Sequence, residues 1–237
     1  MNRSLPPLLF SLTVLPLVTA SMVVVFLTME NEAEVVQYPA VIAVAYLFGS
    51  IPWGYILLRW RLGVDIREYG SGRIGMANVL RTGGSKVAGL VLDLGKGILA
   101  VLLARAVIDT TAGEVVTGLA VLAGHNWPVF LQFKGGRGVV TGLGGLAVMA
   151  PMAAGLGALV FIPITLGSRY LSLGSMTAVV VASIAMLALG LAGVYSSGYT
   201  LYAFVASAII LWQHRDNIRR IRQGTERRLG QPAKPAD

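Results

Sequence analysis

The sequence has no cysteine and only two histidines, His125 and His214. Without cysteine, the chain can form no disulfide framework, no thiolate nucleophile and no cysteine-ligated metal centre. Two histidines also leave too few ligands for a dedicated metal site unless carboxylates supply nearly all the rest. We therefore expect no bound metal ion.

Charged residues are scarce as well, at 13% of the 237 residues, whereas hydrophobic residues make up 55%. A soluble globular domain carries about 25% charged residues. A membrane-spanning helix needs about 20 mostly apolar residues, and the composition therefore predicts an all-α, polytopic transmembrane helix bundle. The long runs with little or no charge are 4–29, 35–58, 87–104, 115–133, 138–168 and 170–213. Within the third run, Asp93 and Lys96 are spaced to form an intramembrane ion pair.

The charges between these runs predict how often the chain crosses the membrane. Cytoplasmic loops carry the excess of lysine and arginine. If 138–168 and 170–213 each cross twice, the second with a turn near 193–198, then nearly all basic residues share one side. Arg105 alone joins the acidic residues opposite, which are Glu30, Glu32, Glu34, Asp109 and Glu114. We therefore predict eight hydrophobic segments with both termini in the cytoplasm, the fifth and sixth being short or broken near Pro151 and Pro163.

The first hydrophobic run has two interpretations. Arg3 before an apolar stretch, followed by Val18-Thr19-Ala20, resembles a signal peptide with a small-residue cleavage site. We favour its retention as an extra N-terminal helix. Residues 1–40 are then an N-terminal extension, 41–229 the membrane-embedded domain and 230–237 a disordered tail.

A Gly-rich polar segment, 65–81, is the first place on the basic side that can carry chemistry. Its glycines allow tight turns and close backbone approach, while Ser71, Asn78, Arg73 and Arg81 offer hydrogen bonds and charge. That combination suits an anion-binding loop. An ordinary Gly-rich cytoplasmic loop with positive-inside arginines has the same composition.

The second polar segment, 124–138, contains Lys134 and Arg137 on either side of two glycines. Such a pair can surround a phosphate with two cations and backbone N–H groups, although the P-loop pattern is absent. The alternative is positive-inside anchoring of the preceding span. His125 lies in an apolar stretch, which favours a packing role.

The third segment follows the last hydrophobic run. His214 and Asn217 are three residues apart and share one face of a helix. An ionisable residue at the mouth of a span is a functional candidate. Arg227 and Arg228, further on, are typical of a tail that binds lipid headgroups.

Together these segments resemble the PlsY family of bacterial integral-membrane acyl-phosphate:glycerol-3-phosphate acyltransferases. The resemblance covers residues 41–229 and is carried by several motifs in the same order. They are Gly49-Ser50-Ile51-Pro52, the 65–81 loop, Leu92-Asp93-Leu94 with Lys96-Gly97, 124–130 with 133–139, Arg169-Tyr170-Leu171-Ser172-Leu173 with Ser175, and 214–218 with Gly224-Thr225-Glu226.

The resemblance implies a seven-helix core, to which the first run adds one helix. It implies transfer of a fatty acyl group from acyl phosphate to the sn-1 hydroxyl of glycerol 3-phosphate, which gives lysophosphatidic acid and phosphate, the first step of phospholipid synthesis. It also implies no cofactor and a place in the bacterial cell (inner) membrane with the active site facing the cytoplasm. We expect a monomer that contacts its two substrates and membrane lipids but no nucleic acid.

Residue by residue, the resemblance implies a catalytic set and a phosphate-binding set. The catalytic residues would be Ser71, His214 and Asn217, and the phosphate-binding residues Arg81, Arg137, Ser175, Asn78 and Lys134. No Ser-His-Asp order is present, and Asp216 points about 100° away from His214 on a helix. We therefore expect a substrate phosphate to take the proton of the acceptor hydroxyl, with no acyl-enzyme.

The chain departs from the family pattern at Arg73, Met76 and Ala77, where the family has Asn, Ala and Thr, and at Arg137, where it has Lys. Arginine keeps the charge but presents a planar fork of donors. Three alternatives stay open: a diverged paralogue with another acceptor, a transporter of phosphate-bearing anions built on broken helices, and a membrane protein whose basic tail binds anionic lipid.

Overall fold

The computed structural model describes residues 13–29, 32–83 and 86–234, and the regular elements in that part of the chain are all helices. In chain order they are α2 (Leu15–Thr28), α3 (Glu34–Gly49), α4 (Trp53–Leu62), η2 (Ile66–Glu68), α5 (Met76–Arg81), α6 (Lys86–Val107), α7 (Thr111–Asn126), η3 (Val129–Leu131), α8 (Val139–Met149), α9 (Pro151–Ser168), α10 (Leu171–Leu191), α11 (Ser197–Gln213) and α12 (Arg215–Arg222). The predicted all-helical class is confirmed.

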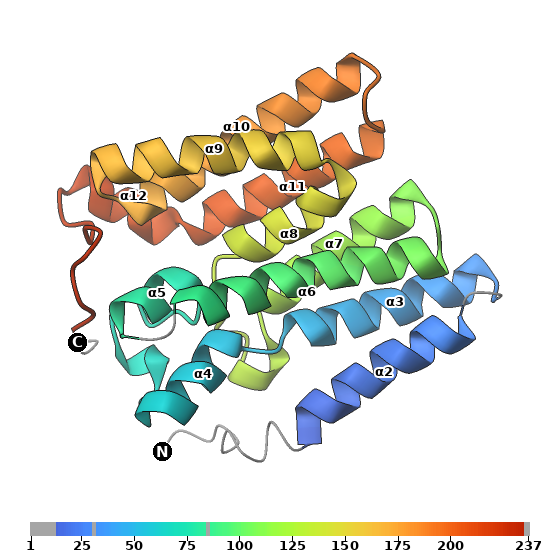
Figure 1. Cartoon of the computed structure of the whole chain (residues 1–237), viewed down its shortest axis with the longest axis horizontal. Helices are drawn as coiled ribbons and strands as arrows, with labels where there is room; N and C mark the ends of the chain where they lie inside the picture. Colours follow the sequence, from blue (N-terminus) through green and yellow to red (C-terminus); the bar gives the residue numbers. More distant parts are fainter. Residues whose placement is uncertain (1–12, 30–31, 84–85, 235–237) are drawn as a thin grey trace.

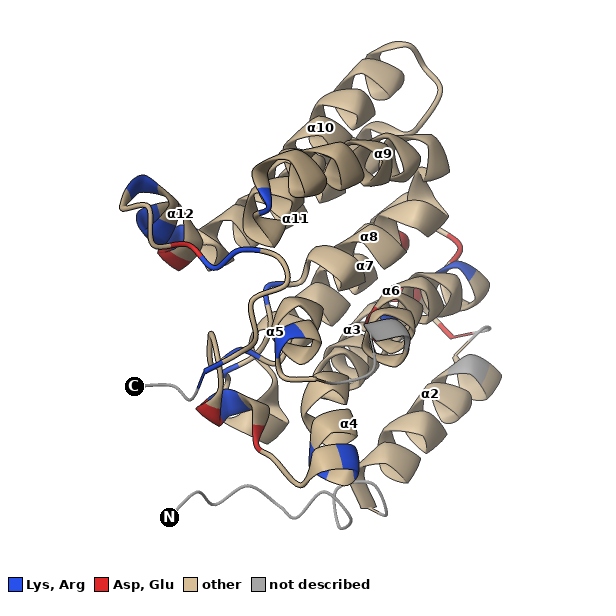
Figure 2. Cartoon of the chain, turned by 60° about the vertical axis from the view of Figure 1, so that its left-hand side comes forward, with Lys and Arg blue, Asp and Glu red and all other residues tan. Residues whose placement is uncertain are grey.

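The long helices run back and forth along one axis of the molecule (Figure 1). The run 138–168 forms two helices, α8 and α9, as predicted, and the predicted turn lies between α10 and α11. The segments 63–75, 127–138, 169–170 and 214–234 consequently meet at one end, which we call the basic end. Figure 2 shows most lysines and arginines gathered there.

Among the described residues, three helical stretches are long and apolar enough to cross a membrane, namely Glu34–Leu62, which includes both α3 and α4, Pro151–Ser168 and Leu171–Leu191. Leu15–Val25 and Val139–Met149 are apolar but shorter. The short fifth segment is thereby confirmed: α8 has 11 residues and ends just before Pro151, which starts α9. A break near Pro163 is wrong, because α9 continues through that residue to Ser168.

The run 35–58, which we took for one segment, is interrupted. Helix α3 ends at Gly49, and α4 starts after Pro52. Helix breaks expose carbonyl groups that need hydrogen-bond donors inside a membrane protein. Here Lys96 of α6 donates to the carbonyl oxygens of Gly49 at 3.0 Å and Ile51 at 3.3 Å. The predicted ion pair is also present, with Lys96 Nζ 3.1 Å from Asp93.

Helix α2 continues through Ala20, after which the alternative interpretation placed a cleavage site. Its buried Val18 and Val25 pack against α3 and α6. Residues 1–12, which include Arg3, lie outside the described residues.

The expected disordered tail differs from the structure over residues 230–234. Ala233 N–H donates to the Arg81 carbonyl, and the Lys234 carbonyl accepts from Gly70 N–H, both at 2.8 Å. These contacts fix the segment on the basic end. Residues 235–237 lie outside the described part of the chain.

Candidate active site

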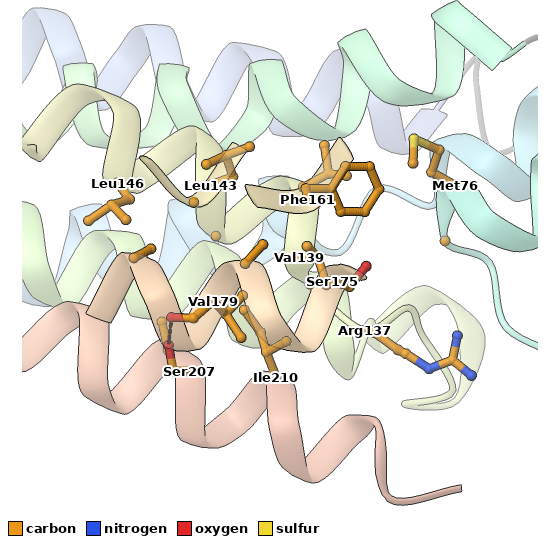
Figure 3. A pocket seen from close by; sticks show the side chains of 18 of the residues that line it. Met76, Arg137, Val139, Leu143, Leu146, Phe161, Ser175, Val179, Ser207 and Ile210 are labelled. Atoms are coloured by element: carbon orange, nitrogen blue, oxygen red, sulfur yellow. Dashed lines mark hydrogen bonds between the residues drawn. The ribbon is translucent and has the colours of Figure 1, made fainter. Parts of the chain in front are cut away.

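A cavity of about 400 Å³ runs from the basic end into the bundle between α8, α9, α10 and α11. Polar residues line its mouth, including Arg73, Asn78, Arg137, Ser175 and His214. Its inner part is apolar and is lined by residues such as Leu143, Leu146, Val179, Ala206 and Ile210. Figure 3 shows the two parts together, with Arg137 and Ser175 at one end and Leu146 and Ser207 at the other.

Four arginines and one carboxylate from separate segments gather at the mouth. Arg137 lies close enough to Arg73, Arg81, Arg220 and Glu226 for each to influence its charge. Burial, reinforced by the Arg73 and Arg220 cations, lowers the pKa of Arg137 to about 9. Unpaired like charges repel unless an anion lies between them, so this arrangement suits phosphate groups.

The segment 65–81 forms a compact loop around the buried side chain of Asn78. Its Nδ2 donates to the carbonyl oxygens of Ile66, Tyr69 and Arg73, and its Oδ1 accepts from Ser71 N–H at 3.2 Å. These contacts occupy the amide, so Asn78 holds the loop rather than offering free donors to a phosphate. Ser71 is positioned through this contact.

The second Gly-rich segment leads directly into α8, with Gly138 as the residue before its first turn. A helix N-terminus of this kind presents free N–H groups and favours anions. Gly136 N–H donates to the His125 carbonyl at 3.0 Å, and a Cβ at position 136 would collide with the His125 ring. Only glycine fits there, because the loop that carries Arg137 packs directly against the His125 ring.

His125 belongs to a buried polar cluster within the bundle. Its Nδ1 is 3.5 Å from Asp93 Oδ1, and Asp93 in turn pairs with Lys96. Because Lys96 also holds the break between α3 and α4, the cluster connects that break to the loop that carries Arg137. The cluster therefore helps to fix the position of the loop that carries Arg137.

His214 lies between α11 and α12, with 2% of its surface exposed. Its Nδ1 is 2.8 Å from the Ile210 carbonyl oxygen, which can only accept, so Nδ1 carries the proton. Burial, together with the Arg137 cation, lowers the pKa of His214 to about 4. His214 is thus neutral at pH 7 and presents Nε2 as a hydrogen-bond acceptor.

Asn217 is oriented by Glu226. Glu226 Oε1 accepts from Asn217 Nδ2 at 2.7 Å and from Ser172 Oγ at 2.8 Å, and Oε2 accepts from Arg220 Nε at 2.7 Å. Burial alone would raise the pKa of Glu226, but these hydrogen bonds outweigh it and lower the pKa. Asp216 lies toward Arg73, at 4.0 Å, and not toward His214.

Several polar atoms of the site are buried without a hydrogen-bonding partner among the described residues. They are Arg81 Nε, Arg137 Nε and Asn217 Oδ1. An unpaired buried polar group costs about 1–3 kcal/mol, and such groups in a native protein point to a functional role. All three residues are among those that the sequence selected.

The structure brings most of the predicted site residues together. Asn78, Arg137, Ser175 and His214 line the cavity, while Ser71, Arg81 and Asn217 are joined to the same cluster through Asn78, Arg227 and Glu226. Lys134 is the exception. It is exposed, does not line the cavity and has no side-chain hydrogen bond or ion pair in the part of the chain that the structure describes.

Sequence reasoning missed the roles of Arg73, Arg220, Glu226 and Ser172. Arg73 was named among the charged residues of the 65–81 loop and as a departure from the family pattern, but not as a site residue; its guanidinium lies at the mouth and donates to Gln213 at 3.0 Å. Glu226 was named only as the last residue of the motif Gly224-Thr225-Glu226, with no role assigned to it. Among the described residues, no group of three or more His, Asp or Glu side chains could hold a metal ion.

The model of the family described as "Glycerol-3-phosphate acyltransferase" matches residues 39–224. The chain belongs to this family of acyltransferases. A curated relative from Dehalococcoides mccartyi, "Glycerol-3-phosphate acyltransferase 3", is 44% identical over 208 residues, which cover 82% of this chain and 96% of the relative. A Synechococcus glycerol-3-phosphate acyltransferase is 46% identical over 198 residues, covering 81% and 96%.

Two solved structures of PlsY, an integral membrane glycerol 3-phosphate acyltransferase, are similar to this chain. The glycerol 3-phosphate form has a TM-score of 0.74 and 40% identity, and the lysophosphatidic acid form 0.72 and 38%. Both alignments cover 82% of this chain and 96% of the solved one. The chain is therefore an integral membrane protein with the PlsY-type fold.

Proposed function

We propose that this acyltransferase moves a fatty acyl group from acyl phosphate to the sn-1 hydroxyl of glycerol 3-phosphate, releasing lysophosphatidic acid and phosphate. The observation that carries the proposal is one continuous cavity with an arginine-rich mouth and an apolar interior. A lipid substrate with a phosphate head requires both parts in one site. The two similar PlsY structures are a glycerol 3-phosphate form and a lysophosphatidic acid form, and lysophosphatidic acid combines a phosphate head with an acyl chain.

The mouth has the charge that two phosphorylated substrates need. Arg73, Arg81 and Arg137 can each make charge-assisted hydrogen bonds to phosphate oxygens, which are about twice as strong as neutral ones. Arg73 replaces the asparagine that is usual in the family loop, so this departure adds a phosphate-binding charge at the mouth. That addition supports binding of a phosphorylated acceptor.

The inner cavity suits a long acyl chain. Twelve residues of α11 separate His214 at the mouth from Tyr202 at the far end, a rise of about 18 Å. One leaflet of a bilayer has about half of the ~30 Å hydrocarbon thickness. The cavity therefore has the depth of a membrane-derived fatty acyl chain. A transporter would need polar groups along a whole path, and this interior supplies few.

The reaction forms a bond between the sn-1 oxygen and the acyl carbon and breaks the bond from that carbon to the phosphate oxygen. Neutral His214 accepts a hydrogen bond at Nε2 from the neighbouring sn-2 hydroxyl of the acceptor, which positions the sn-1 hydroxyl for attack and leaves its single proton free for the phosphate. A substrate phosphate, whose second pKa is near 6, takes the hydroxyl proton at neutral pH. Ser71 donates a hydrogen bond and does not attack, so no acyl-enzyme forms.

The proposed location is the inner membrane of a bacterial cell, with the basic end and the site facing the cytoplasm, which the positive-inside rule supports. Both water-soluble glycerol 3-phosphate and a lipid donor can reach a cavity mouth at the membrane surface. Single cysteines at Arg169 and Thr225 should be labelled from the same side, and opposite labelling would contradict this orientation.

The test is an assay of the purified protein in detergent with glycerol 3-phosphate and either palmitoyl phosphate or palmitoyl-CoA. We expect lysophosphatidic acid and one phosphate per turnover with the acyl phosphate only. Single turnover with labelled acyl phosphate and no acceptor should leave the protein unlabelled. Label that is lost in Ser71→Ala would overturn the direct mechanism.

A further inference from the structure

The segment 227–234 folds back over the 65–81 loop. Four hydrogen bonds join the two segments. Arg81 Nη2 donates to the Arg227 carbonyl oxygen at 3.1 Å, and Arg227 Nη2 donates to the Gly70 carbonyl oxygen at 2.9 Å. Gly70 N–H donates to the Lys234 carbonyl oxygen and Ala233 N–H to the Arg81 carbonyl oxygen, both at 2.8 Å. We call residues 227–234 the clasp. The match to the family model ends at residue 224, before the clasp begins.

We propose that the clasp is a positioning element for phosphate binding, which holds the 65–81 loop and the Arg81 guanidinium in their binding arrangement. The proposal rests on the proposed function, because Arg81 is taken to bind a substrate phosphate. The clasp itself contacts the loop and need not touch the substrate.

The clasp contacts the loop at Arg81, the proposed phosphate-binding residue, and at Gly70, the residue before Ser71. Arg81 is held at both its side chain and its carbonyl, so the directions of its remaining N–H donors are set. Gly70 is held at both its N–H and its carbonyl, and it precedes Ser71. Gly70 has a φ of 58°, and a Cβ there would meet both Asn78 and Ala233. The clasp therefore packs directly on the residue around which the loop turns.

The charges explain why the loop needs an external support. Arg81 lies among Arg220 and Arg227, with Glu226 as the carboxylate that offsets them. Repulsion between cations favours their separation when no anion is bound. Hydrogen bonds from a second segment oppose that separation. A phosphate then meets a loop already ordered, and less binding energy is lost in ordering it.

The clasp is anchored independently of the loop. Leu229 N–H donates to the Arg169 carbonyl oxygen at 2.6 Å, and within the clasp Arg228 N–H donates to Gln231 Oε1 at 2.8 Å. Arg169 lies between α9 and α10, whose contacts with each other are extensive. The clasp thus transmits the position of this rigid pair to the loop.

The experiment compares the full chain with a chain that ends at Leu229 and with Arg227→Ala, Arg227→Lys and Arg228→Ala. Arg228 is the matched control, since it is exposed and its side chain has no contact with the loop. We expect the KM for glycerol 3-phosphate to rise about 3- to 10-fold in the shortened chain and in Arg227→Ala, the effect of about one net hydrogen bond. kcat at saturating substrate should stay close to that of the full chain.

Arg227→Lys should recover much of the lost affinity, because lysine can also donate to the Gly70 carbonyl. Amide hydrogen exchange in residues 66–82 should be faster in the shortened chain than in the full chain, and unaffected in Arg228→Ala. An unchanged or lowered KM with unchanged exchange would overturn the proposal. So would an effect of Arg228→Ala equal to that of Arg227→Ala.

Exchange separates this proposal from the proposed function. If the full chain forms no lysophosphatidic acid, the function fails, and faster exchange of 66–82 in the shortened chain still supports the clasp. If the full chain is active but neither exchange nor KM responds, the clasp alone fails. Size-exclusion profiles of each variant identify any that do not fold. If the shortened chain does not fold, the KM values of Arg227→Ala and Arg227→Lys test the clasp instead.

Discussion

The ammonium group of Lys96 donates a 3.0 Å hydrogen bond to the carbonyl oxygen of Gly49, on a helix that is distant in the sequence. Lys96 is 1% exposed, and its charge is balanced by Asp93. The break between α3 and α4 is therefore stabilised by a cation from α6. This contact also links the break to His125 and the Arg137 loop.

Replacement of Lys96 by methionine should destabilise the fold strongly. It leaves Asp93 as an uncompensated buried charge and two carbonyls without a donor, and breaking a buried pair from one side costs about 3–5 kcal/mol. Thermal unfolding in detergent measures the effect. Lys134→Met is the control, because Lys134 is exposed and unpaired in the described part of the chain, and its unfolding temperature should not change. Equal unfolding temperatures for the two variants would contradict this role.

Glu226 should make stability depend on pH. Its pKa is lowered in the folded protein, so its contribution is present above the unfolded pKa of about 4.3. That contribution is lost as the pH falls through the lower folded value. The unfolding temperature of the unaltered protein should therefore drop more steeply below pH 4.5 than that of Glu226→Gln. Parallel curves for the two proteins would show that the hydrogen bonds to Asn217, Ser172 and Arg220 do not stabilise the carboxylate.

His214 should not set the acid limb of the pH–rate profile. Because burial lowers its pKa to about 4, it stays neutral as the pH falls through 6. A substrate phosphate with a second pKa near 6 becomes protonated there and loses its ability to accept the proton. We expect kcat to fall below about pH 6 in the unaltered protein and, from a lower plateau, in His214→Gln. Loss of that limb in His214→Gln would make His214 the base.

Val179 should limit the length of the acyl chain. It lines the middle of the cavity, whereas its neighbour Val180 does not line the cavity and is 39% exposed on the outer surface of α10. Val179→Phe should lower kcat/KM for long acyl phosphates by about tenfold or more, in line with the cost of over-packing a filled site, ~1–3 kcal/mol, while short ones are spared. Val180→Phe should leave the chain-length profile unchanged. A matching shift in both variants would place the acyl chain elsewhere.

The sequence predicted the apolar helices and the meeting of the basic segments at one end, because these depend on long uncharged runs and on the sign of the charges between them. It did not predict the break after Gly49, since the donor that satisfies its carbonyls, Lys96, lies in another run. From the sequence Pro163 predicts a break, but a helix in a packed bundle tolerates proline when neighbours satisfy the freed backbone.

The sequence predicted the separate motifs of the site, but it did not predict how they come together in space. Glu226 acquires its role only when the chain turns after α12 and brings it to Asn217 and Ser172. Arg73 departs from the family pattern, so pattern matching counted it as a loss although its place at the mouth makes it a cation of the site. Residues 230–234 are polar and short, and only their backbone contacts with the 65–81 loop order them.

The most direct test of the account is the effect of Arg137→Ala on the conversion of acyl phosphate and glycerol 3-phosphate to lysophosphatidic acid. Arg219→Ala is the matched control, an exposed arginine at the same end that does not line the cavity. The loss of a charge-assisted contact worth about 1.5–3 kcal/mol predicts a fall in kcat/KM of roughly 10- to 150-fold in Arg137→Ala and none in the control. Equal kcat/KM for Arg137→Ala and the unaltered protein would contradict the claim that phosphate binds at the arginine-rich mouth.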